Sequence, residues 1–207
     1  GIILLGRARI NTSSGADTAV IEGITPAVYY GGNNDADNSG VLRYCRIEYS
    51  GIALSANNEI NGLTMGAVGS GTTIEYIQVS WNGDDSFEWF GGTVNCKYLV
   101  SYIPVDDEFD TDFGFRGKVQ FGLGVRKPSV ADISGSTHFE SDNNNAPNYN
   151  SPRTQPIFTN MTSIGPKQYD TSIVNPNFTR AAHLRRNSLI SFYNSVIMGW
   201  PQGILYD

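Results

Sequence analysis

Apolar and polar residues alternate in short runs along this chain, and several runs resemble one another. Residues 42–51 match residues 74–83 at an offset of 32, and similar runs return at 157–165 and 189–197. Alternation over four to eight residues predicts half-buried β-strands. Clusters of Gly, Asn and Asp between the runs predict turns. Only residues 180–187 hint at a helical turn, so the pattern predicts an all-β protein.

One segment is repeated more closely. Residues 84–91 return as residues 106–114, which is 22 positions later, and a looser third copy occupies residues 138–142. A repeat of twenty-odd residues is typical of a solenoid, in which each repeat buries its apolar face against its neighbours. The unequal offsets of 32, 22 and 30 favour a right-handed parallel β-helix with irregular coils of about 22–32 residues. We expect one such domain over residues 1–207.

Stacking the coils predicts which side chains form columns. The aromatic ring in each of three runs falls in one outer column, formed by Tyr44, Tyr76 and Tyr98. The acidic repeats place Phe87, Phe109 and Phe139 in an interior ladder. The residues that follow these phenylalanines should point outward: Glu88, Asp110 and Glu140. Polar insertions at 33–38 and 141–156 predict surface loops.

Composition and charge narrow the possible partners. The net charge of −6 argues against nucleic acid and anionic membrane surfaces. The longest aliphatic run, residues 2–5, is too short to span a bilayer. Cys45 and Cys96 are not at zinc-ligand spacing, and we interpret them as small buried hydrophobic residues. Whether they form a disulfide stays open at this point.

The chain opens directly on an apolar run with no visible signal peptide, which suggests a processed or partial chain. We expect one end of the stack to be covered by a missing segment or by a partner, because a bare strand edge invites aggregation.

Four segments together resemble a group of secreted β-helix proteins that are common in Bacteroidetes and other Gram-negative bacteria. They are residues 40–51, 58–66, 84–92 and 106–112. Members of this group are often lipoproteins or carry a secretion tail, and most lack an assigned function. The resemblance implies a pectate-lyase-like architecture and an extracellular or outer-membrane location. It implies no particular reaction.

Carboxylates dominate the candidate chemistry. Eight of the 20 acidic residues lie between positions 84 and 112, with Lys97 as the single base among them. Stacked strands lie about 4.8 Å apart, so superposed acidic turns would crowd their carboxylates. Three interpretations stay open: capping of turns, binding of Ca²⁺, and catalysis. The candidate metal ligands are Asp84, Asp85, Asp106, Asp107, Asp110 and Asp112.

An enzyme of this architecture would act on polysaccharides, as a lyase or a glycoside hydrolase. Its candidate catalytic residues are Asp84, Asp106, Asp110, Arg116 and Lys118. A local salt bridge to the acidic turn is the alternative role for the two bases. With two histidines and no Gly-x-Ser-x-Gly motif, a Ser-His-Asp hydrolase is not expected.

We therefore favour a secreted or outer-membrane-associated surface protein with a binding or structural role, stabilised by Ca²⁺ and with no other cofactor. A polysaccharide or another surface protein would be its partner. The polysaccharide-active enzyme is the alternative.

Overall fold

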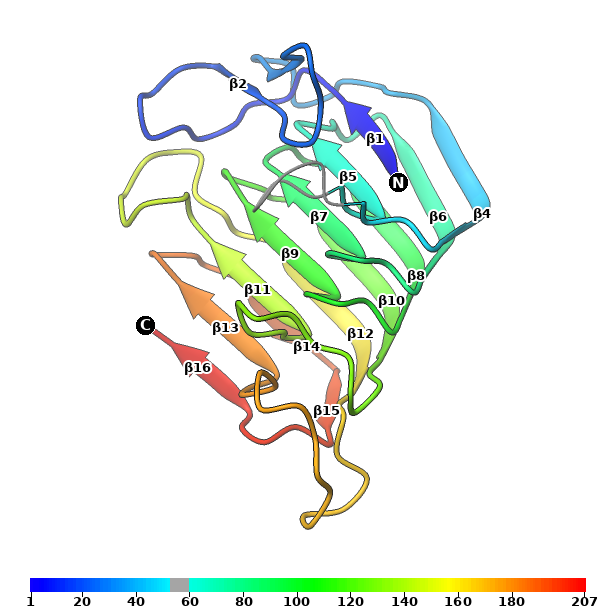
Figure 1. Cartoon of the computed structure of the whole chain (residues 1–207). Helices are drawn as coiled ribbons and strands as arrows, with labels where there is room; N and C mark the ends of the chain where they lie inside the picture. Colours follow the sequence, from blue (N-terminus) through cyan, green and yellow to red (C-terminus); the bar gives the residue numbers. More distant parts are fainter. Residues whose placement is uncertain (53–59) are drawn as a thin grey trace.

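The computed structural model describes residues 1–52 and 60–207, and these ranges form stacked parallel β-strands (Figure 1). No helix occurs in them, and hence none that could cross a membrane. The chain alternates between two parallel sheets, so each coil contributes one strand to each sheet. This is the parallel β-helix that the repeat predicts. Residues 58 and 59, which belong to one of the four segments that carry the resemblance, lie outside the described residues.

The two sheets differ in strand length. The short-strand sheet contains, in order, β1 (Ile2–Leu5), β5 (Leu63–Gly66), β7 (Phe87–Phe90), β9 (Phe109–Asp112), β11 (Phe139–Asp142), β13 (Ala182–Arg185) and β16 (Ile204–Tyr206). The long-strand sheet contains β4 (Val41–Glu48), β6 (Thr73–Ser80), β8 (Asn95–Tyr102), β10 (Lys118–Val125), β12 (Ile157–Ile164) and β14 (Ser191–Tyr193), and β15 (Val196–Met198) also pairs with β12. β2 (Thr18–Val20) and β3 (Tyr29–Gly31) form an antiparallel hairpin.

The interior contains the predicted phenylalanine ladder. Phe87 pairs with Phe109, and Phe109 pairs with Phe139, in successive strands of the short-strand sheet. All three side chains are fully buried, and their neighbouring ring centroids lie 5.5 and 5.8 Å apart. In-register parallel pairing places like residues over like, and here the result is a continuous apolar core.

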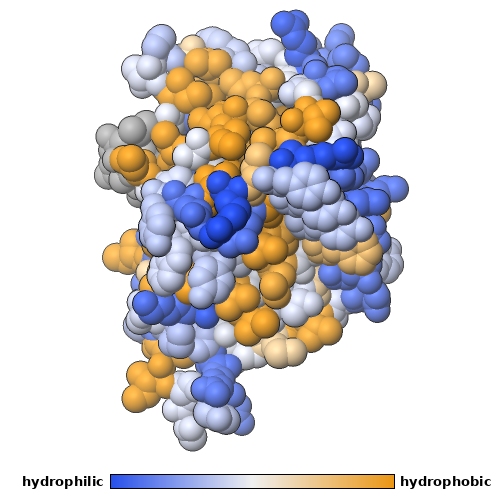
Figure 2. All heavy atoms as spheres, turned by 90° about the vertical axis from the view of Figure 1, so that its right-hand side faces the viewer, coloured by the Kyte–Doolittle hydropathy of each residue, from blue (hydrophilic) through white to orange (hydrophobic). Residues whose placement is uncertain are grey.

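The long strands bend at one column of residues with positive φ. Tyr44, Tyr76, Tyr98 and Phe121 have φ between 55° and 63°, a conformation that bulky residues adopt rarely. Their rings stack outside the bend with centroid separations of 4.6, 4.4 and 5.1 Å. Stacking offsets the backbone cost, and the predicted tyrosine column is confirmed. Hydrophobic residues are exposed among hydrophilic ones on the side of the molecule where β4 and β6 lie (Figure 2).

The β2–β3 hairpin covers part of the outer face of the short-strand sheet. Its Tyr30 and Ile21 join Phe90, Ile10 and Ala8 in a second buried apolar cluster. Asn11, which precedes the hairpin in the chain, lies against the loop after β11, because its side-chain amide donates to the carbonyl oxygen of Asn143 at 2.7 Å. The outward face of the sheet is therefore enclosed at one edge.

Two local expectations are wrong. Residues 180–187 do not form a helical turn: β13 occupies Ala182–Arg185 and pairs with β11, because stacking on an existing strand overrides weak local preference. The insertion at 141–156 is not a surface loop throughout. Its first two residues end β11, and Asn143 and Asn144 are fully buried. The two cysteines are free, and they lie opposite Ile77 and Ile74 in different columns of the long-strand sheet.

Candidate functional site

Carboxylates form a column on the outward face of the short-strand sheet. Glu88 pairs with Asp110, and Asp110 pairs with Glu140, while the phenylalanine before each one points inward. The predicted alternation is confirmed. The column is nevertheless far from free in solvent, because Glu88 is only 8% exposed. At this position, a side chain that points outward from the sheet is therefore still enclosed by the surrounding loops.

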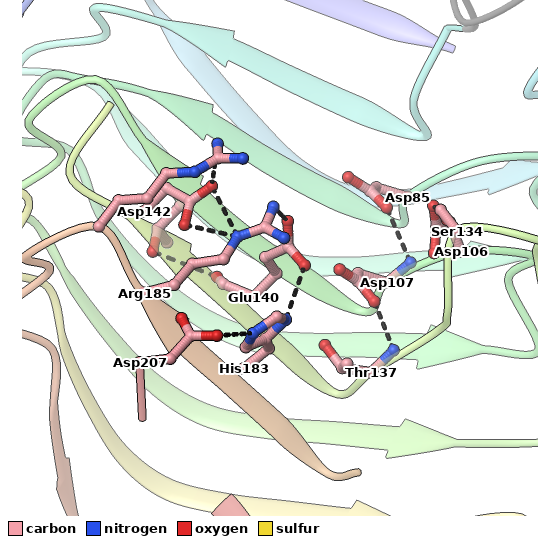
Figure 3. Close-up of polar contacts among 12 residues, drawn as sticks. Asp85, Asp106, Asp107, Ser134, Thr137, Glu140, Asp142, His183, Arg185 and Asp207 are labelled. Carbon is pink, nitrogen blue, oxygen red and sulfur yellow. Dashed lines mark hydrogen bonds and ion pairs between the residues drawn. The ribbon is translucent and has the colours of Figure 1, made fainter. Parts of the chain in front are cut away.

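The two acidic turns lie one above the other, just before these strands. The backbone N–H of Asp107 donates to Oδ1 of Asp85 at 2.7 Å, and the backbone N–H of Thr137 donates to Oδ1 of Asp107 (Figure 3). Each of these carboxylates thus caps the turn of the following coil. Turn capping accounts for one oxygen of Asp85 and one of Asp107, and it leaves the second oxygen of each to other contacts.

Five carboxylates converge around Asp85 in two groups. We call Asp84, Asp85 and Asp106 the outer triad, and Asp85, Glu88 and Asp110 the inner triad. In each group, one carboxylate oxygen per residue lies within 4.8 Å of the others. Oxygens at this spacing can share protons or ligate one hard cation.

The electrostatics of the triads disfavour bare ionised carboxylates. Burial, together with the charges of Asp84 and Asp107, raises the pKa of Asp85 well above its usual range. Burial and the charge of Glu22 do the same to the pKa of Glu88. Burial raises the pKa of Asp106 to about 6, although the Ser134 hydroxyl donates to it at 2.9 Å.

Cations compensate little of this charge. In the described part of the chain, no Lys or Arg forms an ion pair with Asp85, Glu88, Asp106 or Asp110. Moreover, Oδ1 of Asp106 and Oδ1 of Asp110 are buried without a hydrogen-bond partner. A buried acceptor without a donor is costly. Oxygen ligands without Cys or His suit Ca²⁺ better than Zn²⁺ or copper, so the donor set fits the expected ion.

The other end of the column has a different balance of charge. Arg185 donates to both Asp142, at 2.7 Å, and Glu140, and Arg186 donates to Asp142 at 2.8 Å (Figure 3). Nε2 of His183 lies 3.2 Å from Oδ2 of Asp207. Burial raises the pKa of Glu140 to about 7 although Arg185 opposes the shift. Here carboxylates are paired with bases, unlike in the triads.

A groove of about 360 Å³ connects the two ends. One wall is the β2–β3 hairpin with Tyr30 and Glu22, and the other is the outward face of the short-strand sheet. The ionisable residues from that face and the loop after it are Glu88, Asp110, Asp112, Glu140, Asp142, Arg185 and Arg186. The groove is therefore lined by both carboxylates and bases.

The expected site residues are only partly brought together. Asp84, Asp85, Asp106 and Asp110 meet in the triads, whereas Asp107 caps Thr137. Asp112 lines the groove and accepts the N–H of Phe113.

The two candidate bases lie elsewhere. Arg116 pairs with Asp35 at 2.8 Å, and Lys118 begins β10 in the long-strand sheet. Sequence reasoning also missed Glu88 as a candidate ligand and Arg185 and Arg186 as groove residues. The register of Glu88 over Asp110 would have revealed the first.

A buried polar cluster lies behind the triads. Arg126 pairs with Glu108 at 2.7 Å, and the ring of His138 lies 3.6 Å from Glu108. All three side chains are inaccessible to solvent. This cluster supports the backbone of the acidic turns, because Arg126 also donates to the carbonyl oxygens of Pro104 and Thr137.

Comparison with known proteins supports the architecture. No curated protein and no solved structure matches the chain. A family model, described as a pectate-lyase-like β-helix domain, matches residues 1–207. The match spans the whole chain and agrees with the stacked parallel sheets. The chain thus belongs to the pectate-lyase-like β-helix family.

Proposed function

We propose that this chain is a calcium-binding β-helix module of the cell surface or extracellular space that binds a polysaccharide in the groove beside its acidic turns. One observation carries the proposal: the two triads hold converging carboxylates, of which Asp85 and Glu88 are buried, and no Lys or Arg of the described residues forms an ion pair with Asp85, Glu88, Asp106 or Asp110. Ca²⁺ accepts six to eight oxygen ligands in flexible geometry, and carboxylates supply them. Extracellular calcium would keep such a site filled, which is why we place the module outside the cell.

The groove gives the bound ion a role besides stability. Glu88 and Asp110 of the inner triad also line the groove, so a cation there would be adjacent to any ligand in it. The ion would attract anionic or hydroxyl-rich groups, while Arg186 offers hydrogen-bond donors farther along. A surface protein with acidic residues is the other partner class that such a groove could accept.

Catalysis on a polysaccharide is the second candidate, and the groove favours it because carboxylates and arginines line it together. A lyase would need one arginine to act as a base. The hydrogen bond that Arg185 donates to Asp142, with the charge of Glu140, raises the pKa of Arg185 still further, which makes it a poor base. A retaining glycosidase places its two carboxyl groups about 5–5.5 Å apart. Triad oxygens within 4.8 Å of one another are compatible with that separation and equally with a shared cation, so the raised pKa of Arg185, which disfavours a lyase, decides the preference. We therefore favour binding over catalysis.

A glycan array, probed with the purified chain in Ca²⁺ and again in chelator, tests the proposal. We expect binding to at least one polysaccharide class in Ca²⁺ and its loss in chelator. The double variant Glu88→Gln/Asp110→Asn, which changes the inner triad beside the groove, should lose this binding. Glu75→Gln, at a partly exposed acid paired with Arg43, should retain it. Binding that ignores chelator, or no binding to any glycan, would contradict the proposal. A parallel screen on uronate polymers that releases unsaturated or reducing products would establish the enzyme instead.

A further inference from the structure

A neutral side chain extends the inner triad. Asn61 is 1% exposed, and its side-chain amide donates to Oε2 of Glu88. Its own side-chain oxygen, Oδ1, is buried and has no hydrogen-bond partner. The amide nitrogen therefore faces the inner triad, and the amide oxygen is a buried acceptor that nothing in the described residues satisfies. A 180° flip of the amide would turn this oxygen toward Glu88. Amide oxygens are ordinary Ca²⁺ ligands.

The coil geometry explains why Asn61 is at this place. Leu63 pairs with Phe87, so Asn61 occupies in its coil the position that Asp85 occupies in the next one. The backbone N–H of Gly62 also donates to the carbonyl oxygen of Asp85 at 2.8 Å, which fixes the two turns against each other. Asn61 thus continues the column of turn carboxylates as an uncharged oxygen ligand.

The inner triad contains a second orphaned oxygen. Oδ1 of Asp110 is buried without a partner, as Oδ1 of Asn61 is. Oδ1 of Asp106 in the outer triad has the same property. Orphaned acceptors in both triads indicate that each group has its own place for a cation, rather than one place between them.

The charge count leads to the same result. The two triads together contain five carboxylates, because Asp85 belongs to both. Four of them, Asp85, Glu88, Asp106 and Asp110, have no ion pair with a Lys or Arg of the described residues. One divalent cation would leave two negative charges on these four carboxylates, whereas two cations would leave none. Buried charge persists only where it is paired or coordinated.

We infer that the acidic turns bind two Ca²⁺ ions bridged by Asp85, and that Glu88, Asp110 and Asn61 hold the inner ion. This inference rests on the proposed calcium-binding function and adds to it a second ion with named ligands. The inner ion faces the groove, since Glu88 and Asp110 line it. The outer ion is held by Asp84, Asp85 and Asp106.

Equilibrium dialysis of the full chain against Ca²⁺, after removal of bound metal with chelator, counts the ions directly. We expect two Ca²⁺ per chain, and one in Glu88→Gln and in Asn61→Leu, which remove inner ligands without touching the outer triad. Asp84→Asn should also bind one. The control variant Glu75→Gln, on the opposite sheet, should still bind two.

The outcomes separate the two proposals. One ion in the unmodified chain, or two ions in folded Glu88→Gln and Asn61→Leu, would overturn the inner site and leave calcium binding intact. No bound ion would overturn the proposed function as well. Far-UV circular dichroism checks that each variant is folded, and should a variant unfold, the count for the unmodified chain decides.

Discussion

Two columns of this β-helix follow the same stacking rule with opposite consequences. At the bend of the long-strand sheet, Tyr76 lies between Tyr44 and Tyr98 with interplanar angles of 8° and 10°. On the outer face of the short-strand sheet, Asp110 lies between Glu88 and Glu140. Parallel in-register pairing superposes like on like in both places. Rings gain from that superposition, and carboxylates repel one another.

The contrast separates structure from function in this molecule. The aromatic column is satisfied by its own members, since each inner ring has a neighbour on both faces. The acidic column needs something that its neighbours do not provide, namely protons or cations. Repetition therefore stabilises the first column unconditionally and the second only in the presence of a ligand. Removal of a stacked ring should lower the free energy of unfolding at any pH and Ca²⁺ concentration. Removal of the ligand should lower it in a way that depends on pH.

The largest loss of stability is expected where a ring is removed from the interior phenylalanine ladder. Phe109 is fully buried between Phe87 and Phe139, so Phe109→Ala leaves a cavity and should lower the free energy of unfolding by about 3–5 kcal/mol. Urea denaturation measures this change. Phe121→Ala, at an exposed ring, is the matched control and should cost much less. Equal losses would mean that burial does not govern the ladders.

The acidic column predicts an unusual pH dependence in chelator. Carboxyl groups with pKa raised in the fold bind more protons there than in the unfolded chain, so the free energy of unfolding falls as pH rises. The fall should extend from about pH 4, where unfolded Asp and Glu titrate, through the pKa of Asp106 at about 6 to that of Glu140 at about 7. Each group contributes at most about 1.4 kcal/mol per pH unit.

Urea midpoints at pH 4.5 and pH 7.5 test this dependence, and added Ca²⁺ should flatten it. Asp35, whose pKa is lowered to about 2 by its bonds to Arg9, titrates below this window and does not interfere. Stability that increases with pH in chelator would show that the carboxylates are ionised without penalty.

The aromatic column should respond to neither pH nor chelator. Tyr76→Ala removes two stacking contacts and should cost about 1–3 kcal/mol, whereas Tyr44→Ala removes one and should cost about half as much. Urea denaturation with and without Ca²⁺ measures both. If the cost of Tyr76→Ala depended on Ca²⁺, the two columns would be coupled.

The smallest effect is expected at a charged pair beside the aromatic column. Arg43 and Glu75 form an ion pair of 2.9 Å with 48% and 27% of their side chains exposed. Arg43→Ala should change the free energy of unfolding by about 0–1 kcal/mol, because solvent and salt screen such pairs. A loss well above this range would mean that the pair supports the neighbouring edge strand.

The sequence repeats made the fold predictable, whereas insertions between the repeats made part of the site unpredictable. The 22-residue echo placed Phe109 on Phe87 and Asp107 on Asp85, and both placements hold because no insertion separates those coils. Between β11 and β13 the offset grows to 43 residues, so no echo pointed to Arg185 as a neighbour of Asp142. Asn61 was not among the expected residues, because the prediction rested on the repulsion between carboxylates and an amide carries no charge.

The prediction of the catalytic bases Arg116 and Lys118 failed for a similar reason. Arg116 is near the acidic motif in sequence, but the turn after β9 carries it toward Asp35 of the polar insertion at 33–38, and no local pattern could reveal this long-range contact.

Calcium dependence of the melting temperature decides whether the acidic column needs a cation. At a free Ca²⁺ concentration about 100 times its dissociation constant, binding to the folded state adds about 2.7 kcal/mol. For a chain of this length that corresponds to a rise of roughly 5–10 °C between chelator and Ca²⁺ at neutral pH. The variant Asp84→Asn/Asp106→Asn should show a smaller rise, because it loses the outer ion and keeps the ligands of the inner one. It should melt in chelator no lower than the unmodified chain, because two repelling charges are gone. A melting temperature that is the same in chelator and in Ca²⁺ would contradict the calcium site and leave turn capping as the role of these carboxylates.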